Sequence, residues 1–413
     1  MGLNQIVNIS YHPVLVEQKS HINYKYWDTI YNFYYDNKQK NNVEYFYHLL
    51  HYINKNFSIP KELEVPFSKT FGHGTAKIKI YFNSEIYNLY SPFVKIKSDS
   101  LIVPLLRKIS EVNFGQLTLA QIFLKGDHLY FYYEDSMENN DPHKVFSIID
   151  EICYYSDYYD NYFIEKMNVE FAEKPDVKHL LPDELQKIYN QYLEILNEAF
   201  EYYEIFKNIN YYNNIKNIFL ISLLKIHYLL QPQGTLRIEI DNLITQLLQN
   251  SKKDIKELVE ESYPHLENLK NLSKEKFKEY FYKVDFFLFP LKKANLKTAQ
   301  SFLKDYYQIL ADWFQKEYYT DCTTYGILNL LDFLDRYYVE EDIKLYLDSI
   351  LKESAKKDWK TSATIIFDCY NKILQNSIPS IQTSVHKPNN DNLRKPIPKE
   401  QKYFLNLYIK NKR

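Results

Sequence analysis

The sequence predicts an α+β domain followed by an all-α domain. Between Ala76 and Met167, the apolar residues follow the order strand, strand, helix, strand, strand, helix, and they alternate with a period of two in the strands. After Phe171 this alternation ends, and apolar residues recur at the helical period of 3.6. An antiparallel sheet with flanking helices, followed by a helical domain, accounts for both patterns.

Each element of the α+β domain is predicted by a local pattern. Ile78, Ile80 and Phe82 alternate with polar neighbours, as in a strand with one solvated face. Pro104 fits the first turn of a helix, where its missing N–H costs nothing. The segment Lys125–His128 fits a hairpin turn. The expected elements are helices at 24–35 and 43–55, strands at 76–82 and 87–90, a helix at 104–113, a hairpin of 117–124 and 129–133, and a helix from 141 to about 167.

The helical domain is predicted by amphipathic stripes. Pro182 starts the first helix, and only two glycines, Gly234 and Gly326, follow Gly126. We find no fixed 34- or 40-residue repeat. The expected helices span 182–203, 215–230, 236–248, 277–289, 299–314, 328–338, 343–351 and 363–374.

The expected boundaries follow from these patterns. We assign residues 1–172 to the α+β domain and residues 173–376 to the helical domain. Residues 377–398 contain four prolines among Ser, Asn and Lys, which predicts a flexible linker. Residues 399–413, here called the tail, form a basic segment with the apolar run Tyr403–Ile409.

The composition favours an intracellular globular protein. The chain has 413 residues, 45% hydrophobic and 25% charged, with a formal net charge of −2. Tyr and Phe share A/T-rich codons with Ile, Asn and Lys, so a low-GC genome accounts for most of the 41 tyrosines and 26 phenylalanines. Three widely spaced cysteines, Cys153, Cys322 and Cys369, argue against a disulfide scaffold and favour buried thiols. With no visible signal peptide or membrane span, we expect a cytoplasmic location.

Part of the chain resembles a known family. The stretches 76–82 and 89–93, the helix 104–114, and the strands and helix that follow to 167 resemble the YbjN-type domain. The most family-like detail is Val112-Asn113-Phe114, directly followed by a strand. The resemblance covers residues 20–170, roughly a third of the chain, and implies the fold of type III secretion chaperones and binding of other proteins. It implies no catalytic residue, and the aromatic content and long helical extension depart from the family's short form.

Three groups of residues are candidates for chemical sites. Glu44, His48 and His51 share one helix face at zinc-ligand spacing, but a solvated surface is the expected role. The loop Phe71–Thr75 has two glycines around His73, so it fits either a loop that presents a general base or an ordinary turn before the strand at Ala76. The acidic residues of helix 141–167 are expected to follow the ordinary division of an amphipathic helix; they are Asp150, Glu151, Asp157, Asp160 and Glu165.

The missing catalytic motifs and the resemblance together predict a non-enzymatic chaperone-like or adaptor protein. It would hold another polypeptide, such as a secreted or toxic cargo, and no cofactor or metal is expected. An enzyme with a site at the domain junction is the alternative. Another protein is the expected partner rather than a nucleic acid, and a homodimer is compatible with the pattern. The expected anchors are aromatic residues on the exposed side of the sheet: Tyr81, Tyr87, Tyr90, Tyr130 and Tyr132.

The tail is expected to dock. From Lys387 onward there are eight Lys or Arg and two Asp or Glu, so this end is basic while the rest of the chain is acidic. The tail would dock on the protein's own acidic body, on another protein, or on a nucleic acid or membrane. The residues expected to make contact are Phe404, Leu407 and Tyr408, with Leu405 beside them.

Overall fold

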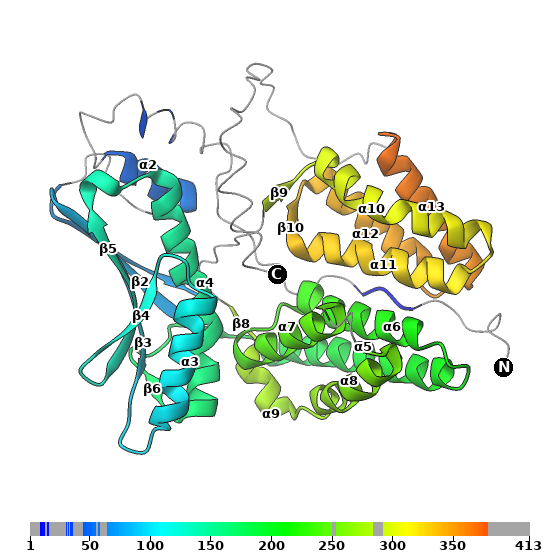
Figure 1. The fold of residues 1–413 in the computed structure, drawn as a ribbon, viewed down its shortest axis with the longest axis horizontal. Helices are drawn as coiled ribbons and strands as arrows, with labels where there is room; N and C mark the ends of the chain where they lie inside the picture. Colours follow the sequence, from blue (N-terminus) through cyan, green and yellow to red (C-terminus); the bar gives the residue numbers. More distant parts are fainter. Residues whose placement is uncertain are drawn as a thin grey trace. The chain divides into compact units, whose positions relative to one another are not determined.

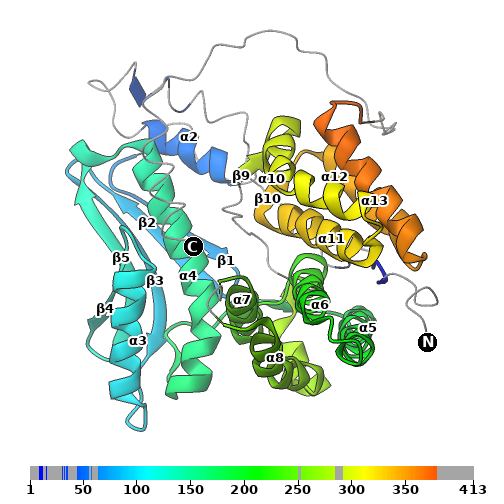
Figure 2. The same ribbon diagram turned by 45° about the vertical axis from the view of Figure 1, so that its right-hand side comes forward.

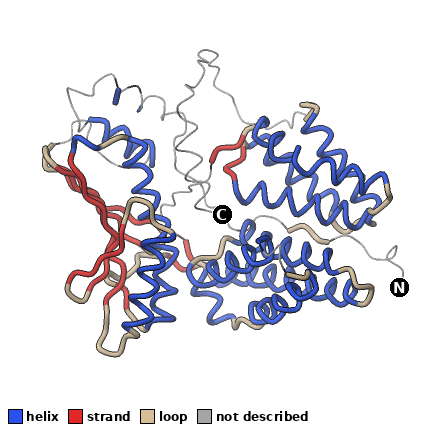
Figure 3. Tube along the Cα trace, viewed as in Figure 1, coloured by secondary structure: helices blue, strands red, loops and turns tan. Residues whose placement is uncertain are grey.

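The computed structural model describes residues 9–12, 15, 30, 32, 34–35, 44–54, 57, 64–249, 253–283 and 292–378. They form two compact units. The α+β unit holds the described residues from 30 to 177, and the helical unit holds residues 9–12, 15, 178–249, 253–283 and 292–378. Strands gather in the first unit and helices dominate the second (Figure 3). The fold class predicted from the sequence is therefore confirmed.

The α+β unit is built on an antiparallel sheet with the strand order β1-β2-β3-β5-β4. A short strand, β6 (Glu170–Phe171), pairs with the end of β3. Helices α3 (Ile102–Gly115) and α4 (Pro142–Met167) lie along the same face of this sheet (Figures 1 and 2). The remaining elements are β1 (Phe67–His73), β2 (Ala76–Phe82), β3 (Ile86–Lys95), β4 (Gln121–Lys125), β5 (His128–Ser136) and α2 (Glu44–Ile53).

The core of this unit lies between the sheet and its helices. Alternate residues of the central strands, such as Ile78, Leu89 and Phe131, are fully buried. Phe163 of α4 packs edge-on against Phe93, with ring centroids 5.1 Å apart. Asp141 caps α4 by accepting hydrogen bonds from the N–H groups of the first turn, as the Asp-Pro pair predicts.

Strand β1 was not predicted. It follows the prolines that end the helical pattern, and its sequence, FSKTFGH, places polar residues on both faces. The strand is stabilised by its pairing with β2, because Phe67 and Phe71 lie opposite Phe82 and Ile78 of β2. A strand at the edge of a sheet needs only one buried neighbour, so its alternation is weak.

One side chain pairs with backbone groups at the outer edge of β4. In the β4–β5 hairpin, Ile122 directs its backbone N–H and C=O away from β5. Asn113 at the end of α3 pairs with both groups: its Oδ1 accepts the N–H at 2.7 Å, and its Nδ2 donates to the C=O at 2.9 Å. This amide occupies the position that the backbone of another strand would take. Asn113 therefore blocks this part of the β4 edge.

The helical unit has one continuous hydrophobic core that joins its helices. Two short strand pairs accompany them, β7 (Lys178–His179) with β8 (Tyr282–Lys283), and β9 (Lys292–Ala294) with β10 (Tyr337–Val339). The helices are α5 (Pro182–Lys207), α6 (Tyr212–Lys225), α7 (Gly234–Gln249), α8 (Ile255–Lys270), α9 (Lys274–Phe277), α10 (Leu296–Gln315), α11 (Tyr319–Arg336), α12 (Glu341–Ser354) and α13 (Trp359–Leu374).

Two details of this unit differ from the prediction. The helix expected at 277–289 is wrong in its described part, because α9 ends at Phe277 and Phe281 is extended before β8. Helix α8 was missed because Pro264 and many charged residues obscure its stripe, although Leu258 and Leu266 are buried. A helix that is polar on most of its surface has only a narrow apolar stripe, so it is hard to predict from its sequence.

An N-terminal segment, Ile9–His12, belongs to the helical unit, although it lies within the range expected for the α+β domain. Its anchor is Lys225 of α6, which is 1% exposed and donates a hydrogen bond to the C=O of Ser10. Glu198 of α5 accepts the Ser10 N–H at 2.6 Å and its hydroxyl at 2.9 Å, and it pairs with Lys225 at 3.1 Å. Tyr11 donates to Asp348 of α12 at 2.6 Å. We call Ile9–His12 the strap.

Candidate functional site

The sheet has one face that its helices do not cover, which we call the open face (Figure 2). Along the central strands, the side chains that point away from α4 are half-buried, whereas their neighbours in sequence are buried. The open face carries Tyr81, Tyr90, Tyr130 and Tyr132, as predicted, and Phe123 of β4 joins them. A single strand pattern could not identify Phe123, because only the pairing of β4 with β5 brings it into the row.

The aromatic side chains of the open face lie on neighbouring strands in register. Tyr90 of β3 is paired with Tyr132 of β5, and Phe123 of β4 with Tyr130. The ring of Phe123 lies 5.5 Å from the ring of Tyr130 and 5.0 Å from that of Tyr132. Cross-strand aromatic contacts of this kind stabilise the pair and fix the rings. The row is therefore a preformed aromatic surface.

Polar groups surround this aromatic row. The Tyr132 hydroxyl donates to Glu134 at 2.6 Å, and desolvation together with this hydrogen bond raises the pKa of Tyr132 to about 12. The Lys79 ammonium lies 5.6 Å from the centre of the Tyr90 ring and pairs with Glu173 at 2.6 Å. A rigid aromatic centre with a charged border is the usual anatomy of a protein-binding surface.

Tyr87 was wrongly predicted to lie on the exposed side. It is fully buried, its ring is 5.9 Å from Phe46 of α2, and its hydroxyl donates to the C=O of Asn139 at 3.3 Å. Tyr87 and Tyr90 are three residues apart, and an odd spacing in a strand places side chains on opposite faces. The other expected contact residues, Phe404, Leu407 and Tyr408, lie outside the described residues.

A buried acidic pair on α4 holds the turn between β1 and β2. Asp157 accepts hydrogen bonds from the N–H of Thr75 at 2.6 Å and from its hydroxyl at 2.9 Å. The same hydroxyl oxygen also contacts the carboxyl group of Asp160. Desolvation, followed by repulsion from Asp157, raises the pKa of Asp160 well above its ordinary value. The Thr75 hydroxyl has one proton and cannot donate to both carboxyl groups, so both contacts are hydrogen bonds only when Asp160 carries a proton and donates it to the hydroxyl oxygen.

The loop Phe71–Thr75 is therefore an ordinary hairpin turn, one of the two alternatives that the sequence left open. Gly74 has φ +56°, and a Cβ at this position would overlap the Asp157 carboxylate. The side chain of His73 is buried at the end of β1. Glycine thus allows both the left-handed turn and the close approach of the carboxylate.

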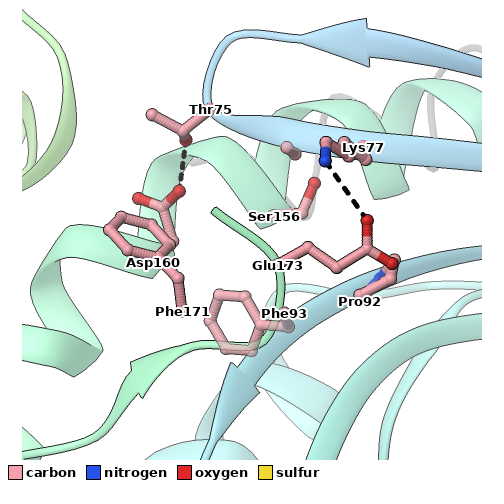
Figure 4. Close-up of a pocket in the computed structure, with 9 residues that line it drawn as sticks. Thr75, Lys77, Pro92, Phe93, Ser156, Asp160, Phe171 and Glu173 are labelled. Atoms are coloured by element: carbon pink, nitrogen blue, oxygen red, sulfur yellow. Dashed lines mark hydrogen bonds and ion pairs between the residues drawn. The ribbon is translucent and has the colours of Figure 1, made fainter. Parts of the chain in front are cut away.

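A small pocket adjoins the acidic pair (Figure 4). Thr75 and Asp160 line one side, and the ion pair of Lys77 with Glu173 lines the other. The space amounts to about 10 Å³, which accommodates about one water molecule. A pocket of this size does not admit a sugar or a comparable substrate, so the two carboxylates are placed to hold the turn rather than to cleave a glycosidic bond.

The acidic residues of α4 do not follow the expected amphipathic division. Asp150, Glu151, Asp157 and Asp160 are all buried. Glu151 accepts three backbone hydrogen bonds, each 3.0 Å long, from the N–H groups of the consecutive residues 118, 119 and 120. The sequence pattern missed this role because the partners are loop amides, which carry no residue-type signal.

The histidine and cysteine candidates have structural surroundings. His48 and His51 are half-buried, and both rings contact Tyr47, whereas the sequence predicted a solvated face. Among the described residues, no group of three or more His, Cys, Asp or Glu is placed to hold a metal ion. All three cysteines are buried, and burial raises the pKa of each thiol, which confirms the expected buried thiols.

One further histidine is held between carboxylates. His227 follows α6 in a π-helical turn (Ile226–Leu230). Its Nδ1 lies 2.6 Å from Asp335 and its Nε2 lies 3.3 Å from Asp241. Desolvation lowers the pKa of His227, but the two carboxylates outweigh it and the net pKa is raised. Both ring nitrogens are thus engaged in joining α7 and α11 to the turn.

No family model matches this chain. No curated protein matches it either. Among the helices of the described residues, none has the length and apolar character needed to cross a bilayer. The geometry of the chain itself therefore carries the argument about function.

The acidic pair predicts a pH dependence of stability. A carboxyl group with a raised pKa in the folded state binds its proton more tightly there than in the unfolded chain, where the pKa is about 3.9. The free energy of unfolding should fall as pH rises from about 4 toward the folded pKa, by at most about 1.4 kcal/mol per pH unit. Asparagine mimics the protonated carboxyl group, so Asp160→Asn should flatten this slope and should be relatively more stable at pH 8 than at pH 4.

Urea unfolding of both proteins between pH 4 and pH 8 measures this difference. Glu138→Gln removes an exposed carboxylate of the same unit and should leave the slope unchanged. If Asp160→Asn and the wild type keep parallel profiles, Asp160 is ionised in the folded protein and the proton assignment is wrong.

Proposed function

We propose that this protein is a non-enzymatic chaperone-like or adaptor protein that holds another polypeptide on its open face. The observation that carries this proposal is the aromatic row of Tyr90, Tyr130, Tyr132 and Phe123 on a sheet face that none of the described helices covers. Tyrosine is enriched at protein interfaces and is frequent among the residues that dominate binding energy. A contiguous aromatic surface often marks a site of protein interaction.

The geometry of the row supports binding of a polypeptide. The rings stand on paired strands and contact one another, so little conformational entropy remains to be lost when a partner binds. The Lys79–Glu173 pair and Glu134 at the border offer hydrogen bonds to a peptide backbone. The resemblance of residues 20–170 to the YbjN-type domain favours the same class of partner, including a secreted or toxic cargo. We place the protein in the cytoplasm on the basis of its composition.

The test is native purification followed by mass spectrometry, with two matched variants. Tyr90→Ser with Tyr132→Ser removes two rings of the open face. Phe114→Ser removes an aromatic ring that is 94% exposed at the end of α3, away from the aromatic row. A polypeptide that copurifies in stoichiometric amounts with the wild type should be lost from the double variant and retained by Phe114→Ser.

Two results would contradict the proposal. A polypeptide that binds both variants equally does not use the open face. A bound small molecule or metal, with no copurified polypeptide, would favour the alternative of an enzyme. Circular dichroism of the double variant distinguishes loss of binding from loss of folding.

A further inference from the structure

The sheet has a second surface whose backbone groups are available, the outer edge of β1. The turn of two residues between β1 and β2 makes His73 and Ala76 a hydrogen-bonded pair. By alternation, Gly72, Thr70 and Ser68 direct their N–H and C=O groups away from β2. All three residues are exposed, and within the described part of the chain no hydrogen bond involves their backbone groups.

The two edges of the sheet differ in how they are protected. The β4 edge is occupied at Ile122 by the Asn113 amide. The outward-facing residues of β1 are small and uncharged, and they include neither proline nor lysine. An edge of this kind is a template for an added strand.

The tail contains a segment with the pattern of such a strand. Tyr403–Ile409, YFLNLYI, has seven residues, of which Tyr403, Phe404, Tyr408 and Ile409 have high β-propensity; it contains no Pro or Gly and has Lys on either side. β1 also has seven residues. Twenty-four residues separate Ile378 from Tyr403, a length that spans at most about 85 Å when extended.

We propose that Tyr403–Ile409 of the same chain adds to the outer edge of β1 as an antiparallel strand. The register places Asn406 opposite Lys69. Tyr403, Leu405 and Leu407 then lie opposite Gly72, Thr70 and Ser68 and exchange backbone hydrogen bonds with them.

Side-chain chemistry selects this register. Lys69, Phe67 and Phe71 belong to the face of β1 that the helices cover, because they pair with Ile80, Phe82 and Ile78. The polar amide of Asn406 comes to lie beside the only charged residue of β1, and Phe404 and Tyr408 lie opposite Phe71 and Phe67. Aromatic pairs across strands are stabilising. On the open face, Leu405 and Leu407 lie opposite Thr70 and Ser68, whose small side chains leave room for leucine.

A disulfide between Lys69→Cys and Asn406→Cys tests the register. Paired residues on adjacent strands have the Cα separation that a disulfide needs. Under mild oxidation the double variant should form this bond within one chain, which peptide mapping detects. The native thiols are buried and do not compete. The matched control, Leu124→Cys with Asn406→Cys, places the cysteine on the β4 edge and should not form the bond.

A disulfide-linked dimer would show that the strand comes from a second copy. Equal yields of the disulfide in the two variants would show no preference for β1. Either result overturns the proposal.

Hydrogen exchange gives a second measurement without cysteines. Amides of residues 403–409 should exchange at least about tenfold more slowly than in the free tail peptide. Thr70→Pro removes an outward N–H and should abolish this protection, whereas Leu124→Pro on the opposite edge should not. Fast exchange of these amides in the wild type would also overturn the proposal.

Discussion

Replacing Lys225 with methionine should lower the free energy of unfolding of the helical unit by about 3–5 kcal/mol. Methionine keeps the length of the side chain but removes the ammonium group that binds the C=O of Ser10 and the Glu198 carboxylate. Burial lowers the pKa of Lys225, whereas the Glu198 carboxylate raises it. The charged form of Lys225 is therefore stabilised by Glu198. Without the ammonium, Glu198 is left as a largely buried carboxylate, and the strap loses its central anchor.

Hydrogen exchange of α6 in urea reports the stability of this unit separately from the sheet. Adding Glu198→Gln to Lys225→Met removes the uncompensated charge and should restore part of the loss, because replacing both partners of a buried pair costs less than replacing one. A change below about 1 kcal/mol for Lys225→Met would mean that the strap contributes little, and would contradict this account of the network.

Gly74→Ala should destabilise the α+β unit by about 3 kcal/mol or more. An alanine at positive φ costs about 1 kcal/mol. The new methyl group would also overlap the Asp157 carboxylate, which must move and lose its bonds to the N–H and the hydroxyl of Thr75. Hydrogen bonds to a charged group contribute about 1.5–3 kcal/mol each.

Gly126→Ala is the matched control for the backbone term. Gly126 is also in a hairpin turn with positive φ, +66°, but a Cβ there would meet no atom within 4 Å. Thermal unfolding should therefore show a cost of about 1 kcal/mol for Gly126→Ala. Equal costs for the two variants would show that the acidic pair does not hold the turn.

Much of the fold was predictable because its elements have regular periods. The alternation in Ala76–Phe82 and the Asp-Pro start of α4 are local signals, and both elements lie where the sequence places them. Strand β1 was not predictable from its own residues, since its burial depends on Phe82 and Ile78 of the neighbouring strand. Whether a segment with a weak strand pattern forms a strand depends on the neighbouring strand with which it pairs.

The candidate sites were predictable only in part. Tyr90 and Tyr132 could be assigned to one face from strand parity, and the same parity rule excludes Tyr87. Phe123 needed the strand order. The roles of Glu151 and Asp157 depend on backbone N–H groups far away in sequence, and every residue type except proline supplies such a group. These hydrogen-bond partners therefore cannot be predicted from a pattern of residue types.

The strap has a consequence for the order of events during synthesis. Ser10 and Glu198 are 188 positions apart, and Tyr11 and Asp348 are 337 positions apart. The strap is synthesised long before α12, so it must wait until α12 has been made before the contact of Tyr11 with Asp348 can form. The described strands and helices of the α+β unit end at Phe171, well before that point. Vectorial synthesis thus favours folding of the sheet first, and the strap makes its last contact only late in the synthesis of the helical unit.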